Sequence, residues 1–226
     1  MIQYLFSNSL IGLLFKNPFF FAIFVIAILV VISIHEFAHA WAADRLGDPS
    51  ARNAGRLTLN PLAHLDPIGT IMILFLGFGW GKPVPFDDFN LRNPRKDAAL
   101  ISFAGPAANF ILAILLSIII RVLYLTMGPD TSLIKNLEQI LMPFINLAVL
   151  IGIFNLIPIH PLDGGKILIG LLPQKIAYQW DAVMKRYGFI LILILIFPIF
   201  GFSLFSVIFL IRNAILALLL PGAPLI

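Results

Sequence analysis

The stretch "VISIHEFAHAWAAD", Val31 to Asp44, places two histidines and a glutamate inside one of the most apolar parts of the chain. The apolar block around it is long enough for a helix that crosses a bilayer, which takes about 20 residues. A charged side chain at the middle of such a helix costs about 2.5–3.5 kcal/mol on insertion scales. Polar residues that are retained at this cost indicate a functional site.

The composition is that of a membrane protein. Of the 226 residues, 60% are hydrophobic and only 12% are charged, with a mean hydropathy of +1.01, whereas soluble domains carry about 25% charged residues. The apolar residues form long blocks rather than amphipathic stripes, so the helices have no single water-facing side. We therefore expect an all-α polytopic membrane protein in the lipid bilayer, with about five to six transmembrane helices.

The basic balance of the chain does not indicate a nucleic-acid partner. The net charge of +4 and the pI near 9.6 fit the excess of lysine and arginine that cytoplasmic loops of membrane proteins ordinarily carry. The chain has no cysteine, which excludes disulfides and thiolate metal sites.

The apolar blocks predict a single domain over residues 1–226. Its expected segments are an interfacial or partial helix (1–18), the helix with the two histidines (19–44), a cytoplasmic-side strand and re-entrant region (45–97), a span (98–127), a span that ends in an LDGG turn (139–165), and one or two C-terminal helices (189–220). The last block is too long for one span and contains Pro198 and Gly201, so we expect a break there.

The block Ile68 to Gly81 is expected to enter the membrane and return on the same side. Its strictly apolar core, Ile71 to Phe78, covers about 12 Å as a helix, well short of a bilayer near 30 Å. If the block returns, every loop rich in lysine and arginine falls on the cytoplasmic side. The backbone of such a loop must be paired by protein, and the alternating segment Gly55 to Pro61 is predicted to be an edge strand that closes against it.

His35 and His39 are four residues apart and therefore lie on one face of a helix. Neutral imidazoles at this spacing can both bind zinc, and Glu36, next to the first of them, can serve as the general base toward water. The alternative is that the HExxH pattern arises by chance or that the histidines are interfacial. A glutamate left unpaired in an apolar block would be expensive, so the metal site is favoured.

Two histidines need a third ligand to hold a catalytic zinc ion. Among the eleven acidic residues, Glu36 and Asp163 stand out as the two inside apolar blocks, and Asp163 lies in "FNLIPIHPLDGGKIL". Alone, "LDGG" is typical of a turn in which the aspartate caps the next helix. Together with an intramembrane HExxH pattern, it predicts that Asp163 is the third ligand of one Zn²⁺ per chain.

The two motifs together resemble the site-2 protease family of intramembrane zinc metalloproteases. The similarity continues through "GDPSARNAGRLTLNPLAHLDPIGT" and "AGPAAN", and it is to the compact branch without PDZ or CBS domains. The resemblance implies that His35, His39 and Asp163 bind zinc. It also implies that Glu36 is the catalytic acid and base and that Asn155 stabilises the substrate or the oxyanion. The active site would lie within the membrane near the cytoplasmic face, in the cell (inner) membrane of a prokaryote.

Three further polar residues have open roles. His160 stands where the family commonly has a proline; it could touch the metal or donate to Asp163, or it could lie at the wet edge of a cavity. His64, in "NPLAHLDP", could bind substrate or support a metal ligand, or it could order its own loop. Asn109, in "AGPAANF", is explained by helix packing at least as well as by catalysis.

The expected function is therefore the hydrolysis of peptide bonds in or near transmembrane segments of other membrane proteins, with zinc, water and Glu36 as the general base. The alternative is a non-proteolytic membrane metal-binding protein or transporter. A transporter would need polar positions on successive spans, whereas here the polar residues converge on one point. A zinc hydrolase of lipids or small amides is a further alternative that the resemblance disfavours.

Overall fold

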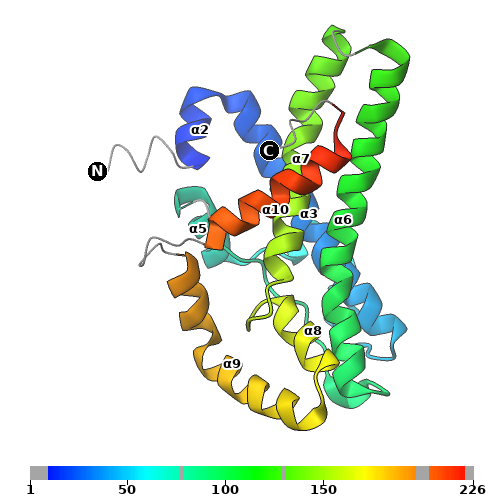
Figure 1. The fold of residues 1–226 in the computed structure, drawn as a ribbon, viewed down its shortest axis with the longest axis vertical. Coiled ribbons are helices and arrows are strands. Elements are labelled where there is room, and N and C mark those ends of the chain that lie inside the picture. Colours follow the sequence, from blue (N-terminus) through cyan, green and yellow to red (C-terminus); the bar gives the residue numbers. More distant parts are fainter. Residues whose placement is uncertain (1–9, 77–78, 129–130, 197–203, 222–226) are drawn as a thin grey trace.

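The computed structural model describes residues 10–76, 79–128, 131–196 and 204–221. The described residues are mostly helical, and their arrangement is shown in Figure 1. In chain order the elements are α2 (Leu10–Lys16), α3 (Pro18–Arg45), α4 (Ser50–Asn53), the 3₁₀ turn η1 (Pro61–Ala63), α5 (Pro67–Leu76), the 3₁₀ turn η2 (Asp88–Asn90), α6 (Pro94–Met127), α7 (Ser132–Asn155), α8 (Asp163–Leu171), α9 (Gln174–Ile196) and α10 (Leu204–Leu219).

Three of these helices, α3, α6 and α7, are long and apolar enough to cross a membrane. The shortest of them, α7, has 24 residues and is therefore about 36 Å long. The helix α10 is apolar but has only 16 residues. A helical multi-pass protein is thus confirmed in outline, while the total of five to six spans stays a prediction. Pro198 and Gly201, where we expected a break, lie outside the described residues.

The three long helices pack around a core of small and branched residues. Ala27 and Val31 of α3, Ala113 of α6 and Ala148 of α7 are fully buried in it. Small side chains let membrane helices approach closely. The opposite side of α6 exposes large apolar side chains, as a lipid-facing surface does: Ile111, Ile114, Leu115, Ile118 and Val122.

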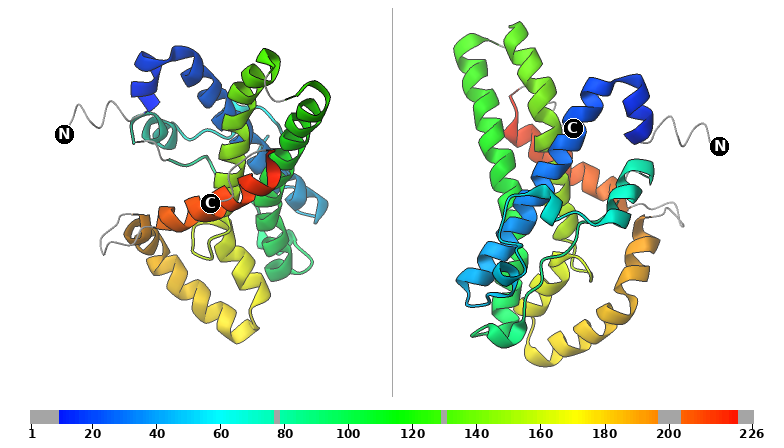
Figure 2. Two further views of the ribbon diagram at one scale, coloured as in Figure 1. Left: turned by 45° about the horizontal axis from the view of Figure 1, so that its top comes forward. Right: turned by 180° about the vertical axis from the view of Figure 1, so that it is seen from behind.

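The ends of the region around α5 lie together. An antiparallel bridge joins Leu65 to Gly81, and the Lys82 amide donates to the His64 carbonyl at 2.8 Å. The chain therefore leaves and returns to one place, as a re-entrant segment requires; its insertion into the bilayer stays a prediction. After this point the chain crosses the face of α3 and reaches the start of α6 (Figure 2, right).

The predicted edge strand over Gly55–Pro61 is wrong. This segment forms turns and bends, and the described residues contain no β-strand. Side chains satisfy its backbone instead: the Thr58 carbonyl accepts a hydrogen bond from His64 Nε2 at 2.8 Å, and the Thr58 hydroxyl accepts one from the Asn60 amide at 3.1 Å. Such local bonds compete with strand pairing.

Candidate active site

His35 and His39 of α3 meet Asp163 of α8, and α6 packs against both helices. The two histidines are buried, and Asp163 is the first residue of α8. Asp163 Oδ2 lies 3.1 Å from His35 Nε2 and 3.3 Å from His39 Nε2, and the two Nε2 atoms are 3.0 Å apart. Within the part of the chain that the structure describes, this is the one group of three or more metal-ligating side chains with their ligand atoms within 4.8 Å of one another.

The donor atoms of this group fit a zinc ion. Ligands in a tetrahedral site with bonds of about 2.0–2.1 Å lie about 3.3 Å apart, close to the separations of 3.0–3.3 Å between these three atoms. Asp163 Oδ2 is also buried without a hydrogen-bond partner among the described residues. Three converging lone pairs of this kind are satisfied together by a cation.

The ring of His39 is oriented by α6. His39 Nδ1 lies 2.7 Å from the carbonyl oxygen of Ile101, and because a carbonyl can only accept, Nδ1 carries the hydrogen. The lone pair of Nε2 is then left for the metal, as is usual for metal-binding histidines. No sequence signal could identify Ile101, since its backbone and not its side chain makes the contact.

Asn109 lies behind His35. It is fully buried, and its side-chain amide lies 3.2 Å from His35 Nδ1. With Nδ2 in this contact, Asn109 Oδ1 is buried without a partner. Turning the amide by 180° gives Oδ1 the Nδ1–H of His35 to accept, which again leaves Nε2 for the metal. The structure thus brings Asn109 against a candidate ligand rather than only against neighbouring helices.

Gly105 lets α6 pass directly against both histidines. A Cβ at this position would overlap His39 Nε2 and would lie 2.7 Å from His35 Cε1. A signal for this arrangement is present in the sequence, because Gly105 and Asn109 are four residues apart and share one helix face. Gly105 and Asn109, which both belong to "AGPAAN", therefore face the candidate metal ligands.

Glu36 follows the first histidine on α3 and is half-buried. Its Oε2 accepts a hydrogen bond of 3.2 Å from the Val84 amide. Val84 stands between Pro83 and Pro85, which have no N–H to donate. The segment from Pro83 to Pro85 therefore has a single amide donor, and that donor contacts Glu36.

Two further candidates, Asn155 and His64, make hydrogen bonds outside the group of three ligands. Asn155 is the last residue of α7, and its side-chain amide donates to the Ile151 carbonyl at 3.0 Å. His64 is fully buried and contacts Thr58 and Arg56. His64 does not belong to the three-residue group around Asp163.

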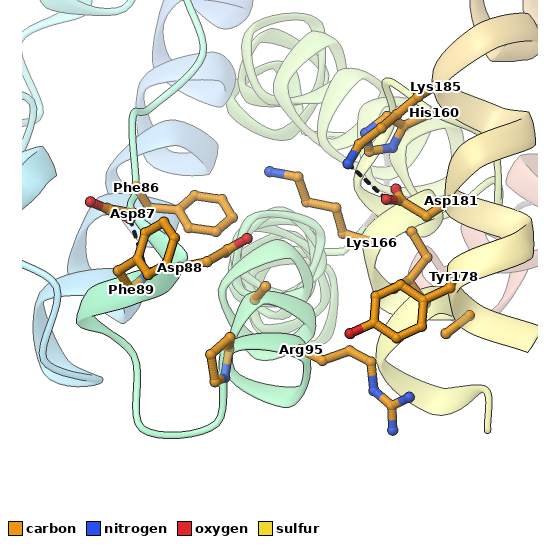
Figure 3. Close-up of a pocket in the computed structure, with 14 residues that line it drawn as sticks. Phe86, Asp87, Asp88, Phe89, Arg95, His160, Lys166, Tyr178, Asp181 and Lys185 are labelled. Atoms are coloured by element: carbon orange, nitrogen blue, oxygen red, sulfur yellow. Dashed lines mark hydrogen bonds and ion pairs between the residues drawn. The ribbon is translucent and has the colours of Figure 1, made fainter. Parts of the chain in front are cut away.

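His160 lines a cavity of about 500 Å³ that adjoins α8. Figure 3 shows His160 near Lys185 and Asp181, with Lys166 reaching toward Phe86. The Lys166 amine lies 3.9 Å from the centre of the Phe86 ring, and burial lowers its pKa. The lining contains as many acidic as basic residues: Asp87, Asp88 and Asp181, and Arg95, Lys166 and Lys185. The cavity therefore favours no ligand charge, and His160 lies in it rather than among the three ligands.

A family model and known proteins match most of this chain. The model of Peptidase family M50 matches residues 23–143 and 124–195. The candidate zinc metalloprotease YwhC of Bacillus subtilis is 38% identical over 197 residues, which are 86% of this chain and 89% of YwhC. The candidate zinc metalloprotease Rip2 of Mycolicibacterium smegmatis is 30% identical over 174 residues, 74% of this chain and 64% of Rip2.

A more distant relative is the regulator of sigma-E protease RseP of Escherichia coli, 32% identical over 106 residues. These residues are 41% of this chain and 23% of RseP. No solved structure matches the chain significantly. The resemblance inferred from "HEFAH" and "LDGG" is thereby confirmed. The chain belongs to Peptidase family M50, the site-2 protease family, and is a zinc metalloprotease of the membrane.

Proposed function

We propose that this chain hydrolyses peptide bonds in or near transmembrane segments of other membrane proteins, with His35, His39 and Asp163 as the zinc ligands. The observation that carries the proposal is the convergence of three ligand atoms from α3 and α8 within 4.8 Å. Asp163 is more than 120 positions from both histidines in the sequence. The supporting contacts of Ile101 and Asn109 direct both imidazoles toward the same point.

Glu36 is the proposed general base. Zinc, when bound at such a site, polarises the scissile carbonyl and lowers the pKa of water. The Glu36 carboxylate takes the proton as water attacks and returns it to the leaving amine. The Val84 amide holds Oε2, so Oε1 is the atom that we assign to the proton transfer.

Asn155 is proposed to stabilise the oxyanion. A side-chain amide has two N–H donors, and one of them is directed to the Ile151 carbonyl. The second can donate to the substrate carbonyl as negative charge develops on its oxygen. This role requires the substrate to approach the end of α7, next to the turn that leads to Asp163.

The substrate must unwind before cleavage, because a helix hides its carbonyls in its own hydrogen bonds. We propose that this occurs near the cytoplasmic face of a prokaryotic cell membrane. The basic loops before α6 and after α8 support this orientation, and the bacterial relatives support the compartment. A complete set of five to six spans, with the α5 region re-entrant, belongs to the same proposal.

The test is the zinc content and proteolytic activity of detergent-purified protein and three variants. We expect about one zinc per chain in wild type, a sharp loss in Asp163→Ala, and retention in Glu36→Gln. Cleavage of a reconstituted membrane-protein substrate should be lost in both. Asp181→Ala is the matched control, since Asp181 lines the cavity that contains His160. This variant should keep both its zinc and its proteolytic activity.

Three results would overturn parts of the proposal. Zinc retained equally in Asp163→Ala would exclude the three-ligand site. Faster cleavage of a soluble unfolded peptide than of any membrane segment would exclude the proposed substrate class. A Glu36→Gln variant with unchanged cleavage would exclude Glu36 as the general base.

A further inference from the structure

Arg56 and His64 form a buried pair beside the segment that contacts Glu36. The exposed fraction of Arg56 is 5% and that of His64 is 0%. Neither residue belongs to the candidate metal group. Arginine is rarely buried to this extent unless it is paired, so the contacts of its guanidinium indicate why it is retained.

The hydrogen bonds of His64 define its tautomer. Nε2 lies 2.8 Å from the Thr58 carbonyl oxygen, which can only accept, so Nε2 carries the hydrogen. Nδ1 is then an acceptor, and Arg56 Nη2 lies 3.4 Å from it. A neutral imidazole thus holds the guanidinium at a defined position.

The same Arg56 nitrogen donates to the carbonyl oxygen of Lys82. The Lys82 amide donates in turn to the His64 carbonyl oxygen at 2.8 Å. The Lys82 carbonyl is therefore held by the Arg56 side chain, and the Lys82 amide by the backbone of residue 64. Its own side chain is exposed and takes no part in these bonds.

Lys82 is two residues before Val84, whose amide donates to Glu36 Oε2. Pro83 stands between them with a restricted φ angle, so the position of Lys82 constrains that of Val84. The other end of the segment is also held, because the buried Asp48 accepts the Asp87 amide at 2.7 Å. The chain that contacts Glu36 thus runs between two buried anchors.

We propose that Arg56 and His64 are positioning residues for the general base: they fix Lys82 and thereby hold the Val84 amide against Glu36. The inference rests on the proposed role of Glu36. Without the pair, the Val84 amide is released and the Glu36 carboxylate is free to leave its orientation. A displacement of about 1 Å in a catalytic group can cost about 10²-fold in rate.

The first experiment does not depend on activity. Hydrogen exchange of the peptide that contains Lys82 and Val84 is compared among wild type, Arg56→Gln and His64→Leu. Both variants should exchange faster at these amides, because Arg56→Gln loses the donor to the Lys82 carbonyl and His64→Leu loses the side chain that orients Arg56. The matched control is Arg52→Gln, since Arg52 is exposed and pairs with Asp44 at 2.5 Å and should leave the exchange unchanged.

The second experiment separates kcat from KM on a reconstituted membrane substrate. We expect kcat to fall by about 10- to 100-fold in Arg56→Gln and His64→Leu, with KM and zinc content unchanged. His64→Asn should recover part of kcat, because its Oδ1 can replace Nδ1 as the acceptor for Arg56. In a Glu36→Asp background, where the shorter carboxylate no longer reaches Val84, Arg56→Gln should cause no further loss.

Other results would overturn the inference. Unchanged exchange in both variants would show that the pair does not hold the segment. A rise in KM with constant kcat, or an additive loss in the Glu36→Asp background, would show that the pair does not act through Glu36. If Arg56→Gln loses zinc or unfolds, His64→Leu keeps the test, since normal exchange and kcat in this variant would also contradict the inference. Wild type without proteolysis would reject the proposed function, while the exchange result would still decide whether Arg56 and His64 hold the Lys82–Val84 segment.

Discussion

Replacing Gly105 with alanine should weaken zinc binding more than it disturbs the fold. The new Cβ would lie 2.7 Å from His35 Cε1 and would overlap His39 Nε2. Carbon atoms in contact are about 3.5–4.0 Å apart, so the His35 ring must move by about 1 Å or α6 must withdraw. Alanine is the better helix former by about 1 kcal/mol, and the helix itself should therefore not be weakened.

The expected loss is at least tenfold in zinc affinity and about 100-fold if both rings move. Changes to the groups that orient metal-binding histidines cost about 10- to 100-fold, which is about 1.4–2.8 kcal/mol. Here the ligands themselves are displaced, so the upper part of this range applies. Chelator competition on detergent-purified protein measures the ratio of the two dissociation constants.

Gly152→Ala is the matched control for this prediction. Its Cβ would meet the Phe110 ring at 3.1 Å, the far end of a side chain rather than a metal ligand, and zinc affinity should stay within about twofold of wild type. Equal zinc affinity in Gly105→Ala and wild type would refute the reasoning, because it would show that α6 does not press against the two histidines.

Three further predictions concern contacts outside the ligands themselves. Asn109→Ala should lower zinc affinity by about 10- to 100-fold in the same competition assay, whereas Asn109→Asp should retain more because a carboxylate can accept the Nδ1–H of His35. Burial alone would raise the pKa of Asp48, but hydrogen bonds from Ser50, the Asp87 amide and Asn90 outweigh it and lower that pKa. Asp48 therefore stabilises the fold fully above about pH 4, and this contribution is lost as the pH falls through the lower, folded-state pKa. The difference in unfolding temperature between wild type and Asp48→Asn should shrink over that acid range, and a difference independent of pH would contradict it. Arg121→Ala should destabilise the end of α10 by about 1–2 kcal/mol, because the Leu219 carbonyl accepts a hydrogen bond from Arg121 Nε at 2.7 Å. Proteolysis near residue 219 should then be faster. Unchanged proteolysis would show that the contact adds no stability.

The segment after α4 shows where inference from sequence fails. The alternation in Gly55–Pro61 favours a strand, but a strand also needs a partner with free backbone groups. In the structure the His64 side chain donates a hydrogen bond to the Thr58 carbonyl, and the Arg56 side chain donates one to the Lys82 carbonyl. These contacts depend on how the chain folds back after α5, which no local pattern encodes.

The sequence by itself determined the membrane class, the two histidines on one helix face, the need for a third ligand and the family. Each of these depends on composition or on spacing within a single helix or turn, where the geometry is regular. The three-dimensional structure decided which distant groups meet: Asn109 behind His35, the Ile101 carbonyl behind His39, and His160 in a separate cavity. Such meetings depend on the packing of α3, α6 and α8. That packing is set by side-chain shape across the whole interface, including the absence of a Cβ at Gly105.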